Sequence, residues 1–190
     1  MNLLGGGLKD AKRHEEGLFV REAQLSTMRR LGAPECDILV VQANLASAYY
    51  ELGRYEDAVR IERDVYSGRL KLFGEENEAT LRTAVNYTRS LGELRRLKEA
   101  KSLLRKTIPV ARRVLGENHE VTLRMRQMYA LSLYKDPAAT LDDLREAVTT
   151  LEETERTARR VFGNTHPHTK GIVWRLRRCL LYTSPSPRDS

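Results

Sequence analysis

The chain has 190 residues, a length that fits one or two ordinary domains or a solenoid of about four or five short repeats. Its residues are 41% hydrophobic and 31% charged, with 12 Gly and 6 Pro, which excludes a disordered or collagen-like chain. The only cysteines, Cys36 and Cys179, are too few for a disulfide scaffold or for most structural zinc modules. Lys and Arg outnumber Asp and Glu by 33 to 26, giving a net charge of +7, so acidic partners have to be considered.

Membrane and secretory segments are not predicted. No stretch approaches the roughly eighteen uninterrupted apolar residues of a membrane span. Met1–Leu4 is followed by three glycines and is too short for the apolar core of a signal peptide. We therefore expect a soluble cytoplasmic protein.

Internal repetition is the strongest feature of the sequence. A Leu-Gly or Phe-Gly pair recurs at Leu31-Gly32, Phe73-Gly74, Leu115-Gly116 and Phe162-Gly163, in steps of 42, 42 and 47 residues. Thr80, Thr122 and Thr169 follow the same steps. Because several columns share one period, we divide the chain into a partial repeat at 1–30, repeats at about 31–72, 73–114 and 115–161, and a partial repeat at 162–178.

The first, partial repeat departs from the others. Gly5-Gly6-Gly7 occupies what should be the middle of its first helix, where each Gly costs about 1 kcal/mol relative to Ala. We expect that helix to fray. A turn at Lys12–Glu16 should then lead into a second helix that ends at Arg30.

Each complete repeat is predicted to form two amphipathic helices. In repeat 31–72, apolar residues fall three or four positions apart, at Leu39, Ala43, Ala46 and Tyr50, and again at Ala58, Ile61 and Val65. Gly53-Arg54 and Leu91-Gly92 are predicted to form the turns between paired helices. The Gly of each Leu/Phe-Gly pair should end the second helix in a left-handed conformation. Four alanines are predicted where neighbouring helices approach closely: Ala46, Ala58, Ala100 and Ala147.

Later repeats carry two irregularities. Pro109 lies late in a second helix, which it should kink or shorten. Five additional residues, Lys135–Ala139, account for the longer last step and should lengthen a turn. A new first helix is predicted to begin at Thr169 and to stop at Arg178.

The composition changes abruptly near the C-terminus. Leu180–Ser190 resembles the conceptual translation of a sequencing-library transposase adapter, and a natural Ser/Pro-rich tail is the alternative. We predict a non-native, disordered tail at 179–190. Because neither end carries a complete capping repeat, the chain also reads as a fragment of a longer array.

Several residues of repeat 31–72 resemble the tetratricopeptide signature: Asn44-Leu45-Ala46, Tyr49, Gly53, Tyr55 and Ala58. The usual tetratricopeptide unit has about 34 residues. The longer period here, with Leu115–Thr122 and Phe162–Thr169 between helix pairs, resembles the kinesin-light-chain type of repeat. The resemblance implies an all-α fold, an α-solenoid of tandem antiparallel helix pairs.

Motifs for chemistry are incomplete. Position 18 is Leu, so His14-Glu15 lacks the second His of a zinc-protease helix. His166 and His168 flank Pro167 without a third ligand at metal-binding spacing. Gly5-Gly6-Gly7 is not followed by the Lys-Ser/Thr ending of a phosphate loop. We therefore predict no enzyme, no cofactor, no metal and no small-molecule substrate.

The tetratricopeptide resemblance implies a concave groove lined by the first helix of each pair. Counting from Leu39, Leu81 and Leu123, it places second, sixth and ninth positions there. The candidate groove residues are Asn44, Ser47, Arg82, Asn86, Arg89 and Arg124. Arg can bind carboxylates bidentately, and an Asn amide can hold a peptide backbone. Val40 and Met128 interrupt this polar pattern. In the alternative interpretation, the Arg side chains only cover solvated surfaces and the Asn side chains bridge helices.

The preferred function is a protein-interaction module or scaffold that binds a protein or peptide, with an acidic partner favoured. The fragment is expected to be monomeric. No heptad run long enough for a coiled coil is present, so attachment to a motor heavy chain does not follow. Two alternatives remain open: a nucleic-acid-binding helical repeat, motivated by the +7 charge, and a regulatory segment of a larger multidomain protein.

Overall fold

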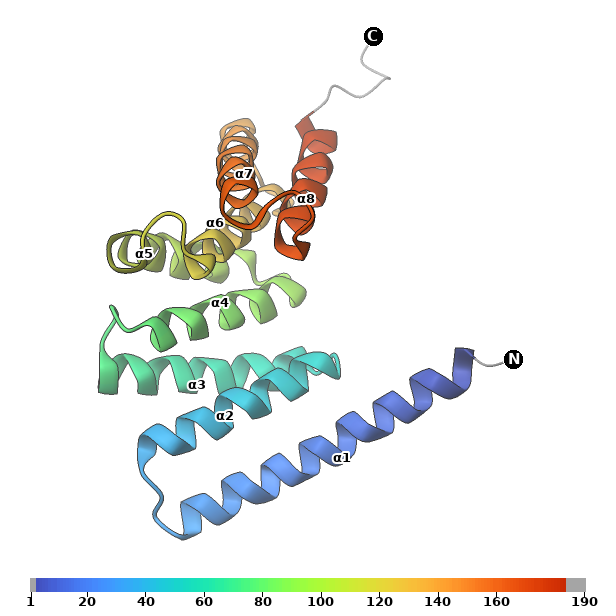
Figure 1. Ribbon diagram of the computed structural model, residues 1–190, viewed down its shortest axis with the longest axis vertical. Coiled ribbons are helices and arrows are strands. Elements are labelled where there is room, and N and C mark those ends of the chain that lie inside the picture. Colours follow the sequence, from blue (N-terminus) through green and yellow to red (C-terminus); the bar gives the residue numbers. More distant parts are fainter. Residues whose placement is uncertain (1–2, 184–190) are drawn as a thin grey trace. The chain divides into compact units, whose positions relative to one another are not determined.

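A computed structural model describes residues 3–183 of the chain, with side chains described over residues 15–181. Within residues 3–183 the chain forms eight α-helices and no strand (Figure 1). Consecutive helices within each unit run antiparallel and pack on each other, which confirms the predicted all-α fold of tandem helix pairs. The chain divides into two compact units, Met1–Leu94 and Arg95–Ser190.

The first unit contains α1 (Leu3–Arg30), α2 (Glu35–Glu51), α3 (Tyr55–Phe73) and α4 (Glu78–Glu93). Each helix packs on the next, and α2 also contacts α4. Leu45, Tyr49 and Ala58 lie in a buried cluster with Leu18 and Leu25 of α1. The apolar stripes seen in the sequence therefore face one another.

The expected turn in the first repeat is wrong, because α1 is one continuous helix from Leu3 to Arg30. Neither the three glycines at 5–7 nor Lys12–Glu16 interrupts it. The physical reason is local. Glycine weakens a helix without blocking its hydrogen bonds, whereas proline, which does block them, does not occur in this segment.

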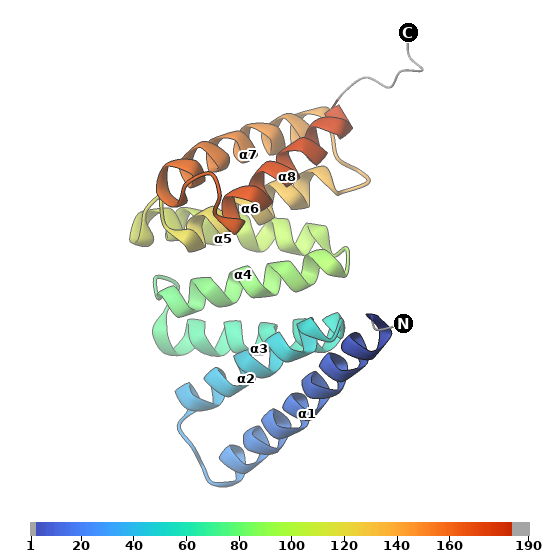
Figure 2. The same ribbon diagram turned by 45° about the vertical axis from the view of Figure 1, so that its right-hand side comes forward.

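The second unit contains α5 (Leu97–Leu115), α6 (Glu120–Tyr134), α7 (Leu141–Phe162) and α8 (Pro167–Thr183). α7 packs on both α6 and α8, and Figure 2 shows α7 and α8 side by side. Its core includes fully buried Leu104, Leu123 and Leu151. A capping box starts α7: the Thr140 hydroxyl accepts a hydrogen bond from the Asp143 amide, and the Asp143 carboxylate accepts one from the Thr140 amide.

The turns that close each repeat contain a glycine at positive φ, as predicted, although ψ differs from that of a left-handed helical C-cap. Gly74, Gly116 and Gly163 have φ values of 80°, 90° and 83°, with ψ between 163° and 175°, a region that is essentially restricted to glycine. The predicted turn at Leu91-Gly92 is wrong. Gly92 lies inside α4, and the positive φ, 59°, belongs to Arg95, which follows Gly53 by one repeat of 42 residues.

The predicted alanine contacts are confirmed, since Ala46, Ala58, Ala100 and Ala147 are each 2% exposed or less. The shortening expected from Pro109 does not occur, because α5 continues to Leu115. The five additional residues fall in the connection between α6 and α7, where the Asp136 carboxylate accepts a hydrogen bond from the Ala138 amide at 2.9 Å.

The C-terminal prediction needs a partial correction. Helix α8 continues to Thr183, and Cys179 is fully buried. Residues 179–183 are therefore helical, because Leu180 and Leu181 favour helix and the first helix-breaking proline of this segment is Pro185. The remainder of the predicted tail, 184–190, lies outside the described residues.

Candidate functional site

The candidate residues on α4 form one stripe. Arg82, Asn86 and Arg89 are four and three positions apart, so they lie on the same face of the helix. The helix is positioned by Asn77, whose side chain accepts a hydrogen bond from the Ala79 amide at 2.9 Å. On α2, Asn44 and Ser47 occupy the positions 42 residues before Asn86 and Arg89.

On α2, one of the two candidate side chains already makes a hydrogen bond within its own helix. Asn44 is exposed and Ser47 is half-buried. The Ser47 hydroxyl donates to the Ala43 carbonyl at 3.2 Å. Asn44 therefore offers an accessible carboxamide, whereas the hydroxyl proton of Ser47 is already engaged.

Arg89 connects α4 to α2 through Tyr50. Its guanidinium carbon lies 3.8 Å from the centre of the Tyr50 ring, a cation–π contact. The Tyr50 hydroxyl donates to the Glu93 carboxylate on α4 at 3.2 Å. Burial, followed by the negative charge of Glu93, raises the pKa of Tyr50 to about 12. Tyr50 therefore stays protonated at neutral pH and braces the C-terminal ends of both helices.

Sequence reasoning did not select Tyr50 or Glu93 as parts of the site. A clue was available for Glu93, which follows Arg89 by four positions and so shares its helix face. Tyr50 was interpreted only as part of an apolar stripe, because its hydroxyl partner lies 43 residues away. Sequence spacing within one helix does not reveal such a partner.

Arg82 and Arg124 have matching surroundings in the two units. Arg82 on α4 pairs with Glu78 at 2.5 Å, and Arg124 on α6 pairs with Glu120 at 2.6 Å. Both arginine side chains are about half exposed, at 52% and 47%. Exposed pairs of this kind contribute only about 0.3–0.5 kcal/mol, so a partner's carboxylate can compete for either guanidinium.

The structure brings only some of the candidate residues together. In the first unit, Arg89 reaches α2 through Tyr50. Arg124 belongs to the second unit, and its grouping with Arg82 and Arg89 stays a prediction. No hydrogen bond joins Asn44 to Asn86 among the contacts described for residues 15–181.

The histidines between helix pairs have a structural role. Asn77, His119 and His166 follow one another at the repeat steps of 42 and 47 residues. Nδ1 of His119 accepts from the Val121 amide at 3.3 Å, and Nδ1 of His166 accepts from the His168 amide at 3.2 Å. His166 also stacks on Phe162, with ring centres 4.9 Å apart. These side chains therefore cap helices.

No group of three or more His, Cys, Asp or Glu side chains among the described residues is arranged to hold a metal ion. None of their helices is both long enough and apolar enough to cross a membrane.

Comparison with known proteins identifies the repeat. Residues 37–113 match the tetratricopeptide repeat family, and the fold of the chain is an all-α solenoid of helix pairs. The structure resembles TPR-like repeats from Podosopora anserina, described as those of a kinesin light chain, with a TM-score of 0.73 and 19% identity, covering 94% of this chain and 83% of that one.

Two further solved structures share the fold. A variant of the same Podosopora anserina repeats gives a TM-score of 0.75 at 19% identity, covering 94% of this chain and 82% of that one. BtubC from P. vanneervenii gives 0.54 at 15% identity, covering 100% and 80%. No curated protein matched the sequence.

Proposed function

We propose that this chain is a protein-interaction module that binds an acidic peptide on the exposed face of its first helices, α2 and α4. Tetratricopeptide repeats are in general protein-interaction scaffolds. The observation that carries the proposal is the α4 stripe: an exposed Arg82, then Asn86, then an Arg89 held by the Tyr50 ring. Arg124 is the equivalent of Arg82 in the second unit.

The chemistry of this stripe suits an extended acidic segment. The ion pair of Arg82 with Glu78 is weak, so the Arg82 guanidinium is available to a partner. A carboxylate of the peptide can accept hydrogen bonds from two of its nitrogens at once. Asn44 and Asn86 each offer one donor group and one acceptor to a peptide backbone. Arg89 is fixed by its aromatic contact, so it loses little side-chain entropy when it binds.

Charge reversal tests the proposal. We expect an Asp/Glu-rich peptide of about 12 residues to bind in a salt-sensitive manner. Arg82→Glu should weaken binding about tenfold, since one charge-assisted contact becomes repulsive. The double variant Arg82→Glu with Arg124→Glu should abolish it. Titration calorimetry of each variant at low and physiological salt measures both effects.

The chain offers a closely matched control. Arg60 and Arg145 are exposed, one lies in each unit, and each pairs with an aspartate three positions earlier. Reversing these two arginines gives the same net charge as reversing Arg82 and Arg124, away from the stripe. Equal loss of binding in both double variants, or full binding in the Arg82/Arg124 variant, would contradict the assignment.

The proposal includes a cytoplasmic setting and no catalytic role. Cys36 and Cys179 are both free thiols, one exposed and one buried, as is usual in a reducing compartment. The polar groups of the α4 stripe suit recognition, since none is a nucleophile placed beside a base.

A further inference from the structure

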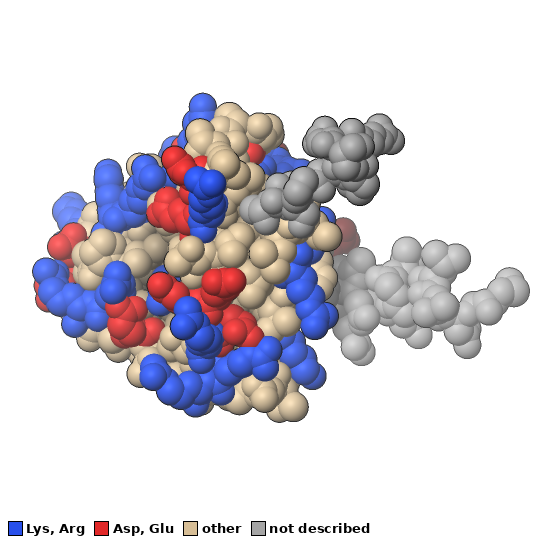
Figure 3. Space-filling view, turned by 90° about the horizontal axis from the view of Figure 1, so that it is seen from above, with Lys and Arg blue, Asp and Glu red and all other residues tan. Residues whose placement is uncertain are grey.

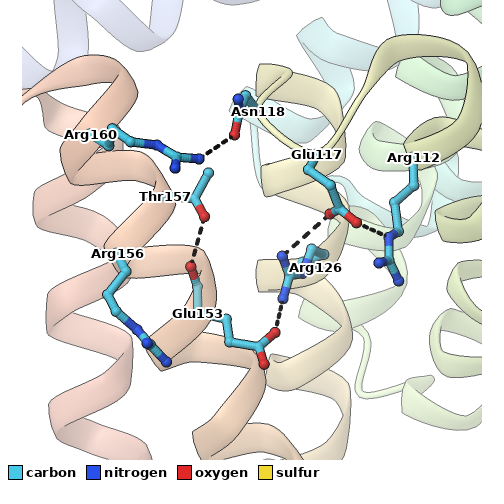
Figure 4. A pocket seen from close by; sticks show the side chains of 8 residues that line it. All are labelled: Arg112, Glu117, Asn118, Arg126, Glu153, Arg156, Thr157 and Arg160. Atoms are coloured by element: carbon cyan, nitrogen blue, oxygen red, sulfur yellow. Dashed lines mark hydrogen bonds and ion pairs between the residues drawn. The ribbon is translucent and has the colours of Figure 1, made fainter.

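The second unit contains a polar pocket that the proposed peptide site does not use. Its volume is about 680 Å³, within the usual range for small-ligand sites. It is lined by the end of α5, the turn between α5 and α6, one side chain of α6 and the C-terminal half of α7 (Figure 4). Four of its lining side chains are arginines and two are glutamates, an excess of two positive charges.

Four of these charged side chains form a network of ion pairs in which positive and negative groups alternate. Arg112 pairs with Glu117, Glu117 also lies 3.6 Å from Arg126, and Arg126 pairs in turn with Glu153. The Arg126 side chain, only 14% exposed, lies at the centre of this network. Figure 4 shows both glutamates directed at Arg126. The four residues together are neutral, so they leave the pocket's other two arginines without a carboxylate.

Those two arginines are Arg156 and Arg160, which are one turn apart on α7. Arg160 donates to the neutral side chain of Asn118 at 2.9 Å. Arg156 has no hydrogen bond or ion pair with any of the side chains described in the structure, and in Figure 4 no dashed line reaches it. Residues four positions apart share a helix face, so both guanidiniums belong to the same wall of the pocket.

The pocket lies on a different side of α6 from Arg124, the equivalent of Arg82 in this unit. Arg124 and Arg126 are two positions apart, which places them about 200° apart around a helix. The position of Arg126 is occupied by Ala84 in the preceding repeat, and Ala84 is fully buried. The third complete repeat therefore places a charged group where the one before it has only a methyl group.

We propose that this pocket binds a phosphate monoester through Arg156 and Arg160 on α7, while the ion pairs of Arg112, Glu117, Arg126 and Glu153 join α7 to the opposite wall. A phosphate monoester carries a charge of about −1.5 to −2 at neutral pH and three acceptor oxygens, which matches the pocket's excess charge. Planar guanidiniums bind such oxygens in pairs. The ester group, whether a small molecule or a phosphorylated peptide, occupies the remaining volume.

Titration calorimetry with phenyl phosphate and with a phosphoserine peptide tests the site and separates the two sources. At least one of the two probes should bind the full chain with submillimolar affinity. Arg156→Gln and Arg160→Gln should each weaken that probe about tenfold, as expected for loss of a charge-assisted contact. Both side chains are exposed, so circular dichroism should show an unchanged fold.

Arg145→Gln is the matched control, because Arg145 is an exposed arginine on the same helix and pairs with Asp142. It removes the same charge and should leave the affinity unchanged. The proposal is overturned by absence of binding for both probes at millimolar concentration, or by an equal loss in Arg145→Gln. It is also overturned if an unphosphorylated Asp/Glu peptide binds with the same dependence on Arg156 and Arg160, because the pocket would then select carboxylates.

Discussion

Glu62 is an unusual single residue of the first unit. It lies on α3 with only 3% of its surface exposed, and neither carboxylate oxygen has a hydrogen-bond partner within the described part of the chain. Burial raises the pKa of Glu62 to about 7, although the neighbouring Ser90 and Arg89 act in the opposite direction. The folded protein therefore favours the protonated acid.

This shift predicts a pH dependence of stability. Between the ordinary pKa of 4.5 and about 7, the folded state holds a proton that the unfolded chain has released. The free energy of unfolding should therefore fall as pH rises through this interval, with the stabilisation fully present below pH 4.5 and lost above about pH 7. The loss is about 3 kcal/mol, since a tenfold change in acidity corresponds to about 1.4 kcal/mol. Urea unfolding at pH 5 and pH 8 measures it.

Glu62→Gln should remove this dependence and make the variant more stable than the wild type at pH 8, because no buried charge forms. Glu56→Gln, an exposed glutamate on the same helix, is the control and should retain the wild-type slope. A wild-type slope in Glu62→Gln would show that Glu62 is already ionised at pH 5.

At the scale of elements, replacing glycine by alanine should change the free energy of unfolding in opposite directions at Gly116 and at Gly92. Gly116 ends α5 with a φ of 90° and no atom within 4 Å of an added Cβ, so alanine there meets backbone strain alone. Gly92 lies inside α4, also without neighbours within 4 Å of an added Cβ. We expect Gly116→Ala to lower the free energy of unfolding by about 1–3 kcal/mol. Gly92→Ala should raise it by up to about 1 kcal/mol.

Chemical denaturation of the two variants measures this difference in sign. Each variant is the other's control, because both replace a hydrogen atom by a methyl group in open space. Stabilisation by Gly116→Ala would contradict the requirement for positive φ at the end of α5. Destabilisation by Gly92→Ala would mean that this glycine is needed for a turn.

The same glycines show how far the sequence predicts the elements. The repeat-closing turns could be located because glycine occupies that column in every repeat. The turn between paired helices was misplaced at Leu91-Gly92, because a glycine near the expected position was preferred over the true equivalent of Gly53, which is Arg95. A non-glycine residue at positive φ has no reliable local pattern, since the surrounding fold imposes the conformation.

At the scale of the whole molecule, the 42-residue repeat spacing predicted the fold. It predicted only part of the candidate site. The stripe of Arg82, Asn86 and Arg89 follows from helix geometry alone. The support from Tyr50 and the alternating charges around Arg126 depend on side chains from different helices, and the spacing within one helix does not encode these contacts. The polar pocket was missed for the same reason, because its arginines are separated by up to 48 residues, from Arg112 to Arg160.

The net charge of +7 has to be weighed against its distribution. Many basic side chains are paired within their own helix, as Arg60 is with Asp57 and Arg82 with Glu78. On the face seen in Figure 3, acidic side chains lie among the basic ones and interrupt the positive surface. A nucleic acid backbone, which presents a regular line of phosphates, therefore meets alternating attraction and repulsion on this face.

We accordingly predict that nucleic acid binding is weak and non-specific. In gel shifts with single- and double-stranded probes, about 1 µM protein should retain neither at physiological salt, because the few phosphate contacts available release few counterions. Any retention of nucleic acid at low salt should disappear steeply as salt is added. An Asp/Glu-rich peptide, by contrast, should still bind the wild-type protein and should fail to bind the Arg82/Arg124 double variant. Sequence-dependent retention at physiological salt would reverse this ranking and make the basic side chains a nucleic-acid interface, since non-specific electrostatics alone cannot discriminate between sequences.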